Sequence, residues 1–473
     1  MGLIFYWKTT IMTLIIAIIL LLSYFFIATE SFTHLNKAAV AMFAGTVGWV
    51  LYISFGTDFV MSRHPAEYID FLSGDAANSV AVKYYIAQNI FLKYVGKAAE
   101  IVLFLLATMT IVEILNNNGC FDFVTHLLRT RNSRKLLWML SGITFVISAN
   151  LDNLTTTTMM LVIMHKIVTA RRLRLFYGAA IVLAANCGGL FTVIGSPETL
   201  VLWNMGAVTA TDYSMSLLLP CLTSWGLSTW WIGRSLPERI ETESVAMPFR
   251  GDETNLKIWQ RVLMFFVAIG GLWFIPTFHN ITKLSPFLGA LCVLAVLWIV
   301  HEVANRKLMN ADQMIHRQVP RVLQYGTLQM MLFVMGMMLA LGVVAEAGVL
   351  SSFADFFEQR IGNIWSLGIF AGAVSCFVDN FATSVSFFLL HTVVEGTRVG
   401  GASLSPFVQN GDFWKLMAYC VTMGGNVLCI GSMSGLAFMK MENMRYGWYF
   451  RNIGWKTLIG SFLGLGVLWL SLM

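Results

Sequence analysis

Two short polar stretches interrupt an apolar sequence, and each places an aspartate directly before an asparagine. The first, SANLDNLTTTT, begins at Ser148, and the second, SCFVDNFATS, begins at Ser375. They share the pattern S-x3-D-N-x2-T, which pairs Ser148, Asp152, Asn153 and Thr156 with Ser375, Asp379, Asn380 and Thr383. Carboxylate, amide and hydroxyl oxygens suit hard cations such as Na⁺ or Li⁺. A carboxylate kept from bulk water also binds a proton readily, so cation and proton could compete for one site.

A second pattern, G-G-x4-I-G-S, follows each polar stretch. It occupies 188–196 in the first copy and 424–432 in the second. Gly-Ser-Pro at 195–197 and Gly-Ser-Met-Ser-Gly at 431–435 are expected to break helices, because glycine weakens a helix and proline removes a donor. Such breaks would add freed carbonyls and further side-chain oxygens to the site, and the candidates within the motifs are Ser196, Ser432 and Ser434.

The composition places these motifs in a membrane. The chain has 473 residues, of which 57% are hydrophobic and 12% charged, and its mean hydropathy is +0.71. Soluble domains carry about 25% charged residues. The sequence therefore predicts an all-α polytopic membrane protein. We interpret the net charge of +6 as Lys and Arg in cytoplasmic loops, not as a nucleic-acid surface.

Long apolar runs give the candidate membrane spans. They are 10–28, 38–54, 98–116, 175–204, 212–232, 262–277, 286–300, 324–345, 412–439 and 454–472. The first run resembles a signal sequence but lacks a clear cleavage site, so a retained helix is expected. Residues 63–97 are too polar to span and are expected to form an amphipathic helix on the membrane surface.

Two further apolar segments, 136–164 and 364–391, are expected to form re-entrant hairpins. Basic residues flank the first on both sides, so both of its ends should be cytoplasmic. Its length cannot supply two crossings of about 20 residues each. The midpoints of the two segments fall near 150 and 377, which places SANLDN and FVDN at the tips.

Loop charges predict opposite orientations for the two hairpins. Counting spans from the first hairpin puts the loops 233–261 and 301–323 inside, and both are basic. The second hairpin then opens outward, and its flanks are poor in base. The expected fold is therefore a pair of inverted-topology repeats, each with a re-entrant hairpin and a broken transmembrane helix. The same counting places Lys8 outside, so the N-terminal topology stays open.

This architecture predicts four regions. Residues 1–97 are N-terminal scaffold spans with the amphipathic segment, and 98–232 form the first repeat. Residues 233–323 hold basic cytoplasmic loops and scaffold spans, and 324–473 form the second repeat. Inverted repeats with discontinuous helices around a midplane site are typical of secondary transporters.

At these residues the sequence resembles the ion-transporter superfamily, and most closely the NhaD-type Na⁺/H⁺ antiporters. The stretches that carry the resemblance are TMTIVEILNNNG (108–119), the two hairpin tips, IGSPETLVLW (194–203) and IGSMSG (430–435). The resemblance implies ion or proton contact at Asp152, Asn153, Asn186, Thr199, Ser375, Asn380, Ser432 and Ser434, and it matches Glu113 to a family glutamate. It also implies a homodimer.

One position departs from the family pattern. The family commonly has an aspartate directly after the glycine of the first break, where this chain has Ser196. Glu198 lies two residues further on and could substitute for that aspartate, which leaves cation preference and stoichiometry open.

The expected function is exchange of Na⁺ or Li⁺ for H⁺, with Na⁺ held at Asp152, Asn153, Asp379 and Asn380 and no cofactor. The alternative is an anion carrier of the same superfamily, moving a dicarboxylate or arsenite. Superfamily members that carry dicarboxylates have Ser-Asn-Thr at the tips, whereas Asp-Asn stands at both tips here. A passive channel would lack coupling to pH. An intramembrane enzyme would need a nucleophile with a base, or metal ligands at helical spacing, and the sequence shows neither.

Structural roles for single residues stay open at this stage. Asn153 and Asn380 could cap tip helices, and the serines could simply pack between helices. Glu198 could complement a helix dipole, and Glu113 could face water. The seven cysteines have no paired spacing and are expected to be packing residues. A bacterial inner (plasma) membrane is the default location.

Overall fold

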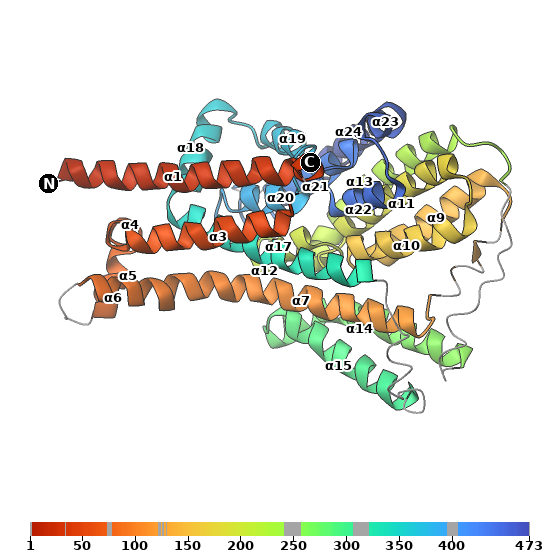
Figure 1. Cartoon of the computed structure of the whole chain (residues 1–473), viewed down its shortest axis with the longest axis horizontal. Helices are drawn as coiled ribbons and strands as arrows, with labels where there is room; N and C mark the ends of the chain where they lie inside the picture. Colours follow the sequence, from red (N-terminus) through yellow and green to blue (C-terminus); the bar gives the residue numbers. More distant parts are fainter. Residues whose placement is uncertain are drawn as a thin grey trace. The chain divides into compact units, whose positions relative to one another are not determined.

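The structure is a computed structural model that describes residues 2–33, 35–72, 78–121, 124, 127–128, 130–240, 257–305, 321–394 and 405–472. The elements within these ranges are helices and short connections (Figure 1). Within the described ranges, nine helical segments are long and apolar enough to cross a membrane. The predicted all-α polytopic fold is confirmed.

The chain divides into two compact units, each assembled from separated stretches. The first unit comprises Met1–Val102, Gly326–Leu367 and Val385–Thr392, and the second comprises the remaining stretches, Leu103–Tyr325, Gly368–Ser384 and Val393–Met473. The four predicted regions stay a prediction. The basic loop residues Arg250, Arg306, Lys307 and Arg317 lie outside the described residues.

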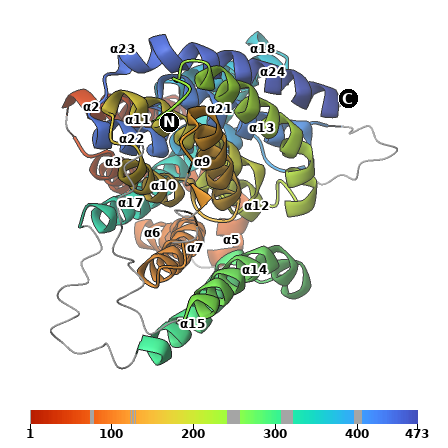
Figure 2. The same cartoon turned by 90° about the vertical axis from the view of Figure 1, so that its right-hand side faces the viewer.

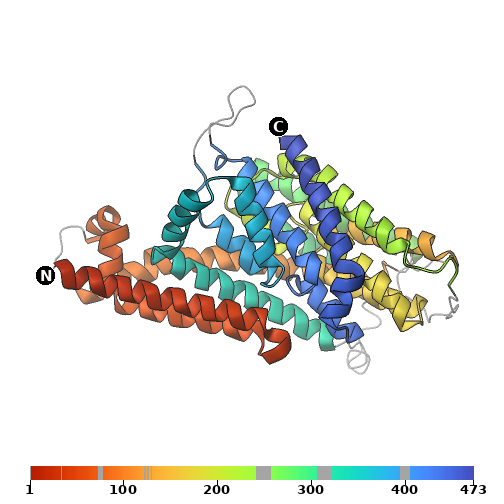
Figure 3. The same ribbon diagram turned by 90° about the horizontal axis from the view of Figure 1, so that it is seen from above.

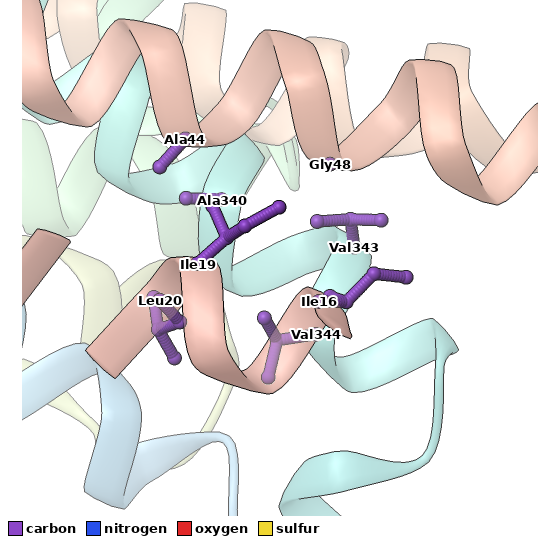
Figure 4. Close-up of a pocket in the computed structure, with 8 residues that line it drawn as sticks. All are labelled: Ile16, Ile19, Leu20, Ala44, Gly48, Ala340, Val343 and Val344. Carbon is purple, nitrogen blue, oxygen red and sulfur yellow. The ribbon is translucent and has the colours of Figure 1, made fainter. Parts of the chain in front are cut away.

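The first unit is built on long helices that pack closely through small residues. Its helices are α1 (Gly2–Ala28), α2 (Glu30–Thr33), α3 (Lys37–Ser54), α4 (Gly56–Arg63), α5 (Pro65–Leu72), α6 (Ser79–Tyr85), the start of α7 (Leu92–Asn117), most of α17 (Arg321–Glu346) and α18 (Val349–Arg360). A β-carbon added to Gly336 would meet the backbone of Met42 at 2.6 Å, so α17 and α3 are in backbone contact. Between α1, α3 and α17 lies an apolar crevice too narrow for a water molecule (Figure 4). This close packing of long helices suits a scaffold.

The second unit contains both tips and both helix breaks. Its helices are the end of α7, α9 (Ser133–Ser148), α10 (Asn153–Ile167), α11 (Arg171–Phe191), α12 (Pro197–Asn204), α13 (Ala210–Gly233), α14 (Ile258–Thr282), α15 (Pro286–Asn305), most of α19 (Ile364–Ser375), the start of α20 (Asn380–Phe388), α21 (Asp412–Leu428), α22 (Met433–Glu442), α23 (Tyr446–Tyr449) and α24 (Trp455–Leu472). Figure 2 shows α9 and α10 beside α11 and α22, and Figure 3 shows the blue C-terminal helix along the yellow-green α13.

Both predicted hairpins are present as pairs of short helices. The arms α9 and α10 have 16 and 15 residues, and α19 and α20 have 12 and 9. Each arm is shorter than the roughly 20 residues that a crossing needs. The connections are residues 149–152 and 376–379, which confirms the predicted tips. The opposite orientation of the two hairpins in a membrane stays a prediction.

The two predicted breaks also occur where the Gly-Ser motifs stand. Helix α11 ends at Phe191 and α12 begins at Pro197, while α21 ends at Leu428 and α22 begins at Met433. Ser196 and Ser432 are the N-caps of the helices that follow, and their hydroxyls accept from the amides three residues on, at 3.4 and 3.0 Å.

The helix that contains the third predicted span is longer than that span. Residues 79–117 form one helical segment that contains a π-helical turn, so the helix begins well before residue 98 and 79–97 is not a separate helix. Its lysines do not end the helix, because lysine is a good helix former whose long side chain can carry its charge to the membrane surface. The predicted span 212–232 forms α13, which is not among the nine segments that meet both the length and the hydropathy criterion.

A buried ion-pair cluster joins three elements of the second unit. The Glu442 carboxylate, 1% exposed, lies 3.0 Å from Arg174 Nε and 2.6 Å from His165 Nε2. Arg171 donates to the Glu442 carbonyl oxygen at 2.9 Å. The end of α22 is therefore held against the end of α10 and the start of α11.

We predict that Arg174→Gln destabilises the protein by about 2 kcal/mol. The change leaves the buried Glu442 carboxylate with only His165 as a side-chain ion-pair partner, and removing one partner of a buried pair costs several kcal/mol when no other remains. The measurement is the midpoint of thermal unfolding in detergent. The matched control is Arg172→Gln, which removes an exposed arginine two positions away and should leave the midpoint unchanged.

Candidate functional site

Asp152 is the capping residue of the first tip. Its Oδ2 accepts from the Thr155 amide at 2.9 Å and from the Thr155 hydroxyl at 3.1 Å. Its Oδ1 is buried and has no hydrogen-bond partner in the described part of the chain. A helix N-terminus favours a negative charge, so α10 stabilises this carboxylate while leaving one oxygen available.

The second tip arranges its aspartate in a related way. Asp379 Oδ1 accepts from the Phe381 amide at 3.0 Å, and the side chain is buried. The Asn380 amide donates to the Gly431 carbonyl oxygen at 2.6 Å, and the Asn380 Oδ1 accepts from the Ser375 hydroxyl at 2.8 Å. The tip is thus bonded directly to the break between α21 and α22.

Buried hydroxyls recur at matching positions after the two aspartates. Thr156 and Thr157 stand four and five residues after Asp152, and their hydroxyls find no partner within the described residues. Thr383 and Ser384 stand at the same offsets from Asp379, and their hydroxyls are also without a partner there. Buried polar groups are rarely left unsatisfied. Each half of the site therefore offers oxygens that a bound ion could satisfy.

The tips pack on the broken helices through the same contacts in both halves. A β-carbon added to Gly188 would strike the carbonyl of Phe145, and one added to Gly424 would strike that of Gly372. Phe145 and Gly372 each lie three residues before the serine that opens the tip motif. The sequence repeat is therefore also a repeat of contacts.

The first broken helix brings the other predicted residues to the tips. The Ser148 hydroxyl donates to the Ala185 carbonyl oxygen at 2.7 Å. Asn153 Nδ2 donates to Asn186 Oδ1 at 3.3 Å. The Ser196 and Thr199 hydroxyls lie 3.0 Å apart, and both residues are buried.

Glu198 is the third buried carboxylate of the site. It stands in the first turn of α12 and is 3% exposed. It is close enough to Asp379 and Asp152 to interact electrostatically with both. Three carboxylates from two tips and one break thus share one buried region, which favours positively charged ligands.

The second broken helix contributes Ser432 and Ser434. Ser432 caps α22, and the buried Ser434 hydroxyl has no hydrogen-bond partner among the residues described. Glu113 is placed differently from the other candidates. It lies partly exposed on α7 and makes no hydrogen bond or ion pair with the tip residues in the described ranges.

The structure also adds a residue that the sequence patterns did not single out. Asn426 is fully buried in α21, and its Oδ1 accepts from Asn186 Nδ2 at 2.6 Å. The signal available in the sequence was an asparagine directly after the Gly-Gly pair of the second copy, where the first copy has Leu190.

Helical hairpins whose tips meet broken helices, with buried acidic and polar side chains at the meeting point, define the architecture of a secondary transporter. The comparisons with known proteins agree with this class. A family model described as "Citrate transporter" matches residues 3–402. The chain belongs to this citrate transporter family.

Several curated relatives of this chain are named as sodium/proton antiporters. It is 33% identical over 377 residues to "Sodium/proton antiporter 1" of Arabidopsis thaliana, covering 78% of this chain and 61% of that protein. It is 31% identical to "Sodium/proton antiporter 2" of the same plant, covering 78% of this chain and 84% of the relative. It is 26% identical to "Na(+)/H(+) antiporter NhaD" of Vibrio parahaemolyticus, covering 76% of this chain and 87% of that protein. The predicted resemblance to NhaD-type antiporters is confirmed.

We predict that Gly195→Ala destabilises the protein by about 1–3 kcal/mol, the usual cost of overpacking. A β-carbon there would lie 2.8 Å from the Ser148 carbonyl oxygen and 2.7 Å from the Gly189 carbonyl oxygen, both of them backbone atoms. The measurement is thermal unfolding followed by size exclusion in detergent.

The matched control is Gly226→Ala in α13, where an added β-carbon meets nothing within 4 Å. Alanine is the better helix former, so this control should unfold at the same temperature or slightly higher. Equal unfolding midpoints for Gly195→Ala and the wild type would contradict the close approach of tip and break.

Proposed function

We propose that this protein is a secondary active transporter that exchanges Na⁺ or Li⁺ for H⁺ by alternating access. The observation that carries the proposal is that Asp152, Asp379 and Glu198 are all buried and that Glu198 interacts electrostatically with both aspartates, while both tips carry unpartnered hydroxyl oxygens among the described residues. The names of the relatives, sodium/proton antiporters from a plant and from Vibrio, support the same ion pair.

Charge at the tips decides between cation and anion transport. Neither Lys nor Arg occurs in the tips 148–156 and 375–383 or in the breaks 192–199 and 429–434. Charges of like sign repel more strongly in a buried region than in water. A dicarboxylate would meet carboxylates from both halves without a compensating cation, whereas Na⁺ would be attracted by all of them. The family description as citrate transporters keeps an anion as the second candidate.

The proposed mechanism uses competition at these side chains. Asp152 and Asp379, with Asn153 and Asn380, bind a cation in one step and protons in the other. Hydroxyl oxygens of Thr156 and its repeat counterpart complete the cation's shell in place of water. Because both ligands use the same carboxylates, release of one on each side of the membrane is coupled to uptake of the other.

We predict that Asp152→Asn abolishes exchange while the protein remains inserted. The asparagine keeps one cap oxygen for Thr155 but removes the charge that cation and proton share. The measurement is a pH-gradient dye assay in inverted membrane vesicles, with Na⁺, Li⁺, K⁺, citrate and arsenite added in turn. The matched control is Asp355→Asn, an exposed aspartate on α18, which should exchange as the wild type does.

The assay separates the two candidate functions. Collapse of the gradient by Na⁺ or Li⁺, lost in Asp152→Asn, supports cation exchange at the first tip. Normal exchange in Asp152→Asn would refute the assignment of the site. Uptake of citrate or arsenite without any response to cations would establish the anion carrier instead.

We also propose that Glu198 replaces the aspartate that the family commonly has at the position of Ser196. Glu198→Gln alone should lower the exchange rate at subsaturating Na⁺ by about tenfold, as expected for one lost charged ligand. Adding Ser196→Asp should restore most of that rate, because aspartate is as good an N-cap as serine and returns a carboxylate to the break. No recovery in the double variant would mean that the two positions are not interchangeable.

The multi-pass helices place the protein in a membrane. We propose the plasma membrane of a bacterial cell as its location and a homodimer as its assembly, with the long helices of the first unit as scaffold.

A further inference from the structure

Asn426 occupies a variable position of the second repeated motif, 424–432, and it lies where the two broken helices touch. It stands in the last turn of α21 and is fully buried. The preceding residue, Gly425, is so close to Asn380 that any β-carbon there would overlap the Asn380 side chain. Asn426 itself accepts from Asn186 Nδ2 at 2.6 Å. It therefore lies where the second half of the site touches the first.

Three amides form a directed chain that ends at Asn426. Asn153 Nδ2 donates to Asn186 Oδ1 at 3.3 Å, and Asn186 Nδ2 donates to Asn426 Oδ1 at 2.6 Å. An asparagine amide has its acceptor and its donors at opposite ends of one planar group. Because Asn426 takes the donor end of Asn186, the oxygen of Asn186 is left to face Asn153.

The same logic fixes the amide of Asn153. Its nitrogen is held by Asn186, and its oxygen makes no hydrogen bond within the described ranges. Asn153 directly follows Asp152, whose Oδ1 is likewise without a partner in the described chain. An oxygen at this place suits a cation, whereas an amide nitrogen in the same place would suit a carboxylate.

The hydrogen bond between Asn186 and Asn426, called here the amide bridge, has no counterpart across the internal repeat. Aligning the Gly-Gly pairs matches Asn186 with Thr422 and Asn426 with Leu190. Leucine cannot accept a hydrogen bond, and the buried Thr422 hydroxyl has no partner among the described side chains and backbone. Since the second copy packs its tip on a broken helix without such a bridge, the bridge serves something other than the shared packing.

We propose that Asn426 is a positioning residue that sets ion specificity, because it holds the Asn186 and Asn153 amides so that an oxygen faces the ion. This inference rests on the proposed cation exchange. Asn426 does not touch the ion in this scheme, and its effect passes through two neighbouring side chains.

The test measures the Na⁺ concentration for half-maximal exchange and the maximal rate in inverted vesicles. Asn426→Leu, which copies the repeat counterpart, and Asn426→Ala both remove the acceptor. In both, half-saturating Na⁺ should rise about tenfold, as expected for the loss of one buried hydrogen bond, and the maximal rate should stay within about twofold. Asn426→Asp keeps an acceptor for Asn186 and should need no more Na⁺ than the wild type.

The matched control is Thr422→Val, which replaces a buried and unpartnered hydroxyl at the repeat counterpart of Asn186 by a methyl group. It should leave half-saturating Na⁺ unchanged. If Asn426→Leu does not insert, the smaller Asn426→Ala variant decides. The proposal would be overturned if the Na⁺ concentration for half-maximal exchange were unchanged in the deciding variant, Asn426→Leu or Asn426→Ala. It would also be overturned if only the maximal rate fell. Absence of Na⁺ exchange in the wild type would instead overturn the proposed function.

Discussion

The structure depends on one constraint, which is that every backbone amide and carbonyl away from water needs a partner inside the protein. A continuous helix meets this demand by itself, but the two breaks do not. Here the side chains at the breaks supply the partners. Ser196 and Ser432 cap the helices that follow, and the Thr192 hydroxyl donates to the Ala149 carbonyl oxygen at 2.6 Å. The polar residues that would bind an ion therefore also allow the breaks to exist.

The same constraint explains the glycines of the second motif. A tip can bond to a break only if the two backbones touch, and Gly431 provides the carbonyl that receives the Asn380 amide at 2.6 Å. Side chains at Gly188, Gly195, Gly424 or Gly431 would collide with backbone atoms of the two hairpins. The glycines thus set the distance between each hairpin and the broken helix on which it packs. A site made in this way is rigid at its base, which suits selection of a small ion.

Much of this arrangement could be predicted because it follows from local sequence patterns. The tips and the breaks each follow from residues within a few positions of one another, whereas capping by Ser196 and Ser432 was not among the roles predicted for these serines. Contacts between helices that are far apart in the sequence could not be predicted. Asn186 and Asn426 stand 240 positions apart, and the repeat alignment hides the contact because it matches Asn426 with Leu190. The continuity of the helix 79–117 was not predicted, because charge along 79–97 was taken as a boundary, although lysines do not end a helix.

The differences between the two halves carry as much meaning as their similarity. Both halves have an aspartate at the tip and free hydroxyls after it, but only the first has a glutamate after its break, since Gly435 and Ser434 occupy the matching region of the second. Only the first has a chain of amides, and that chain ends on the second half. The negative charge is therefore concentrated on one side of an otherwise repeated site. A strictly symmetric site would bind ions equally in both halves. In the proposed exchange, the unequal charges and the single amide bridge make the first tip the stronger cation-binding position, and its amide geometry depends on the second half.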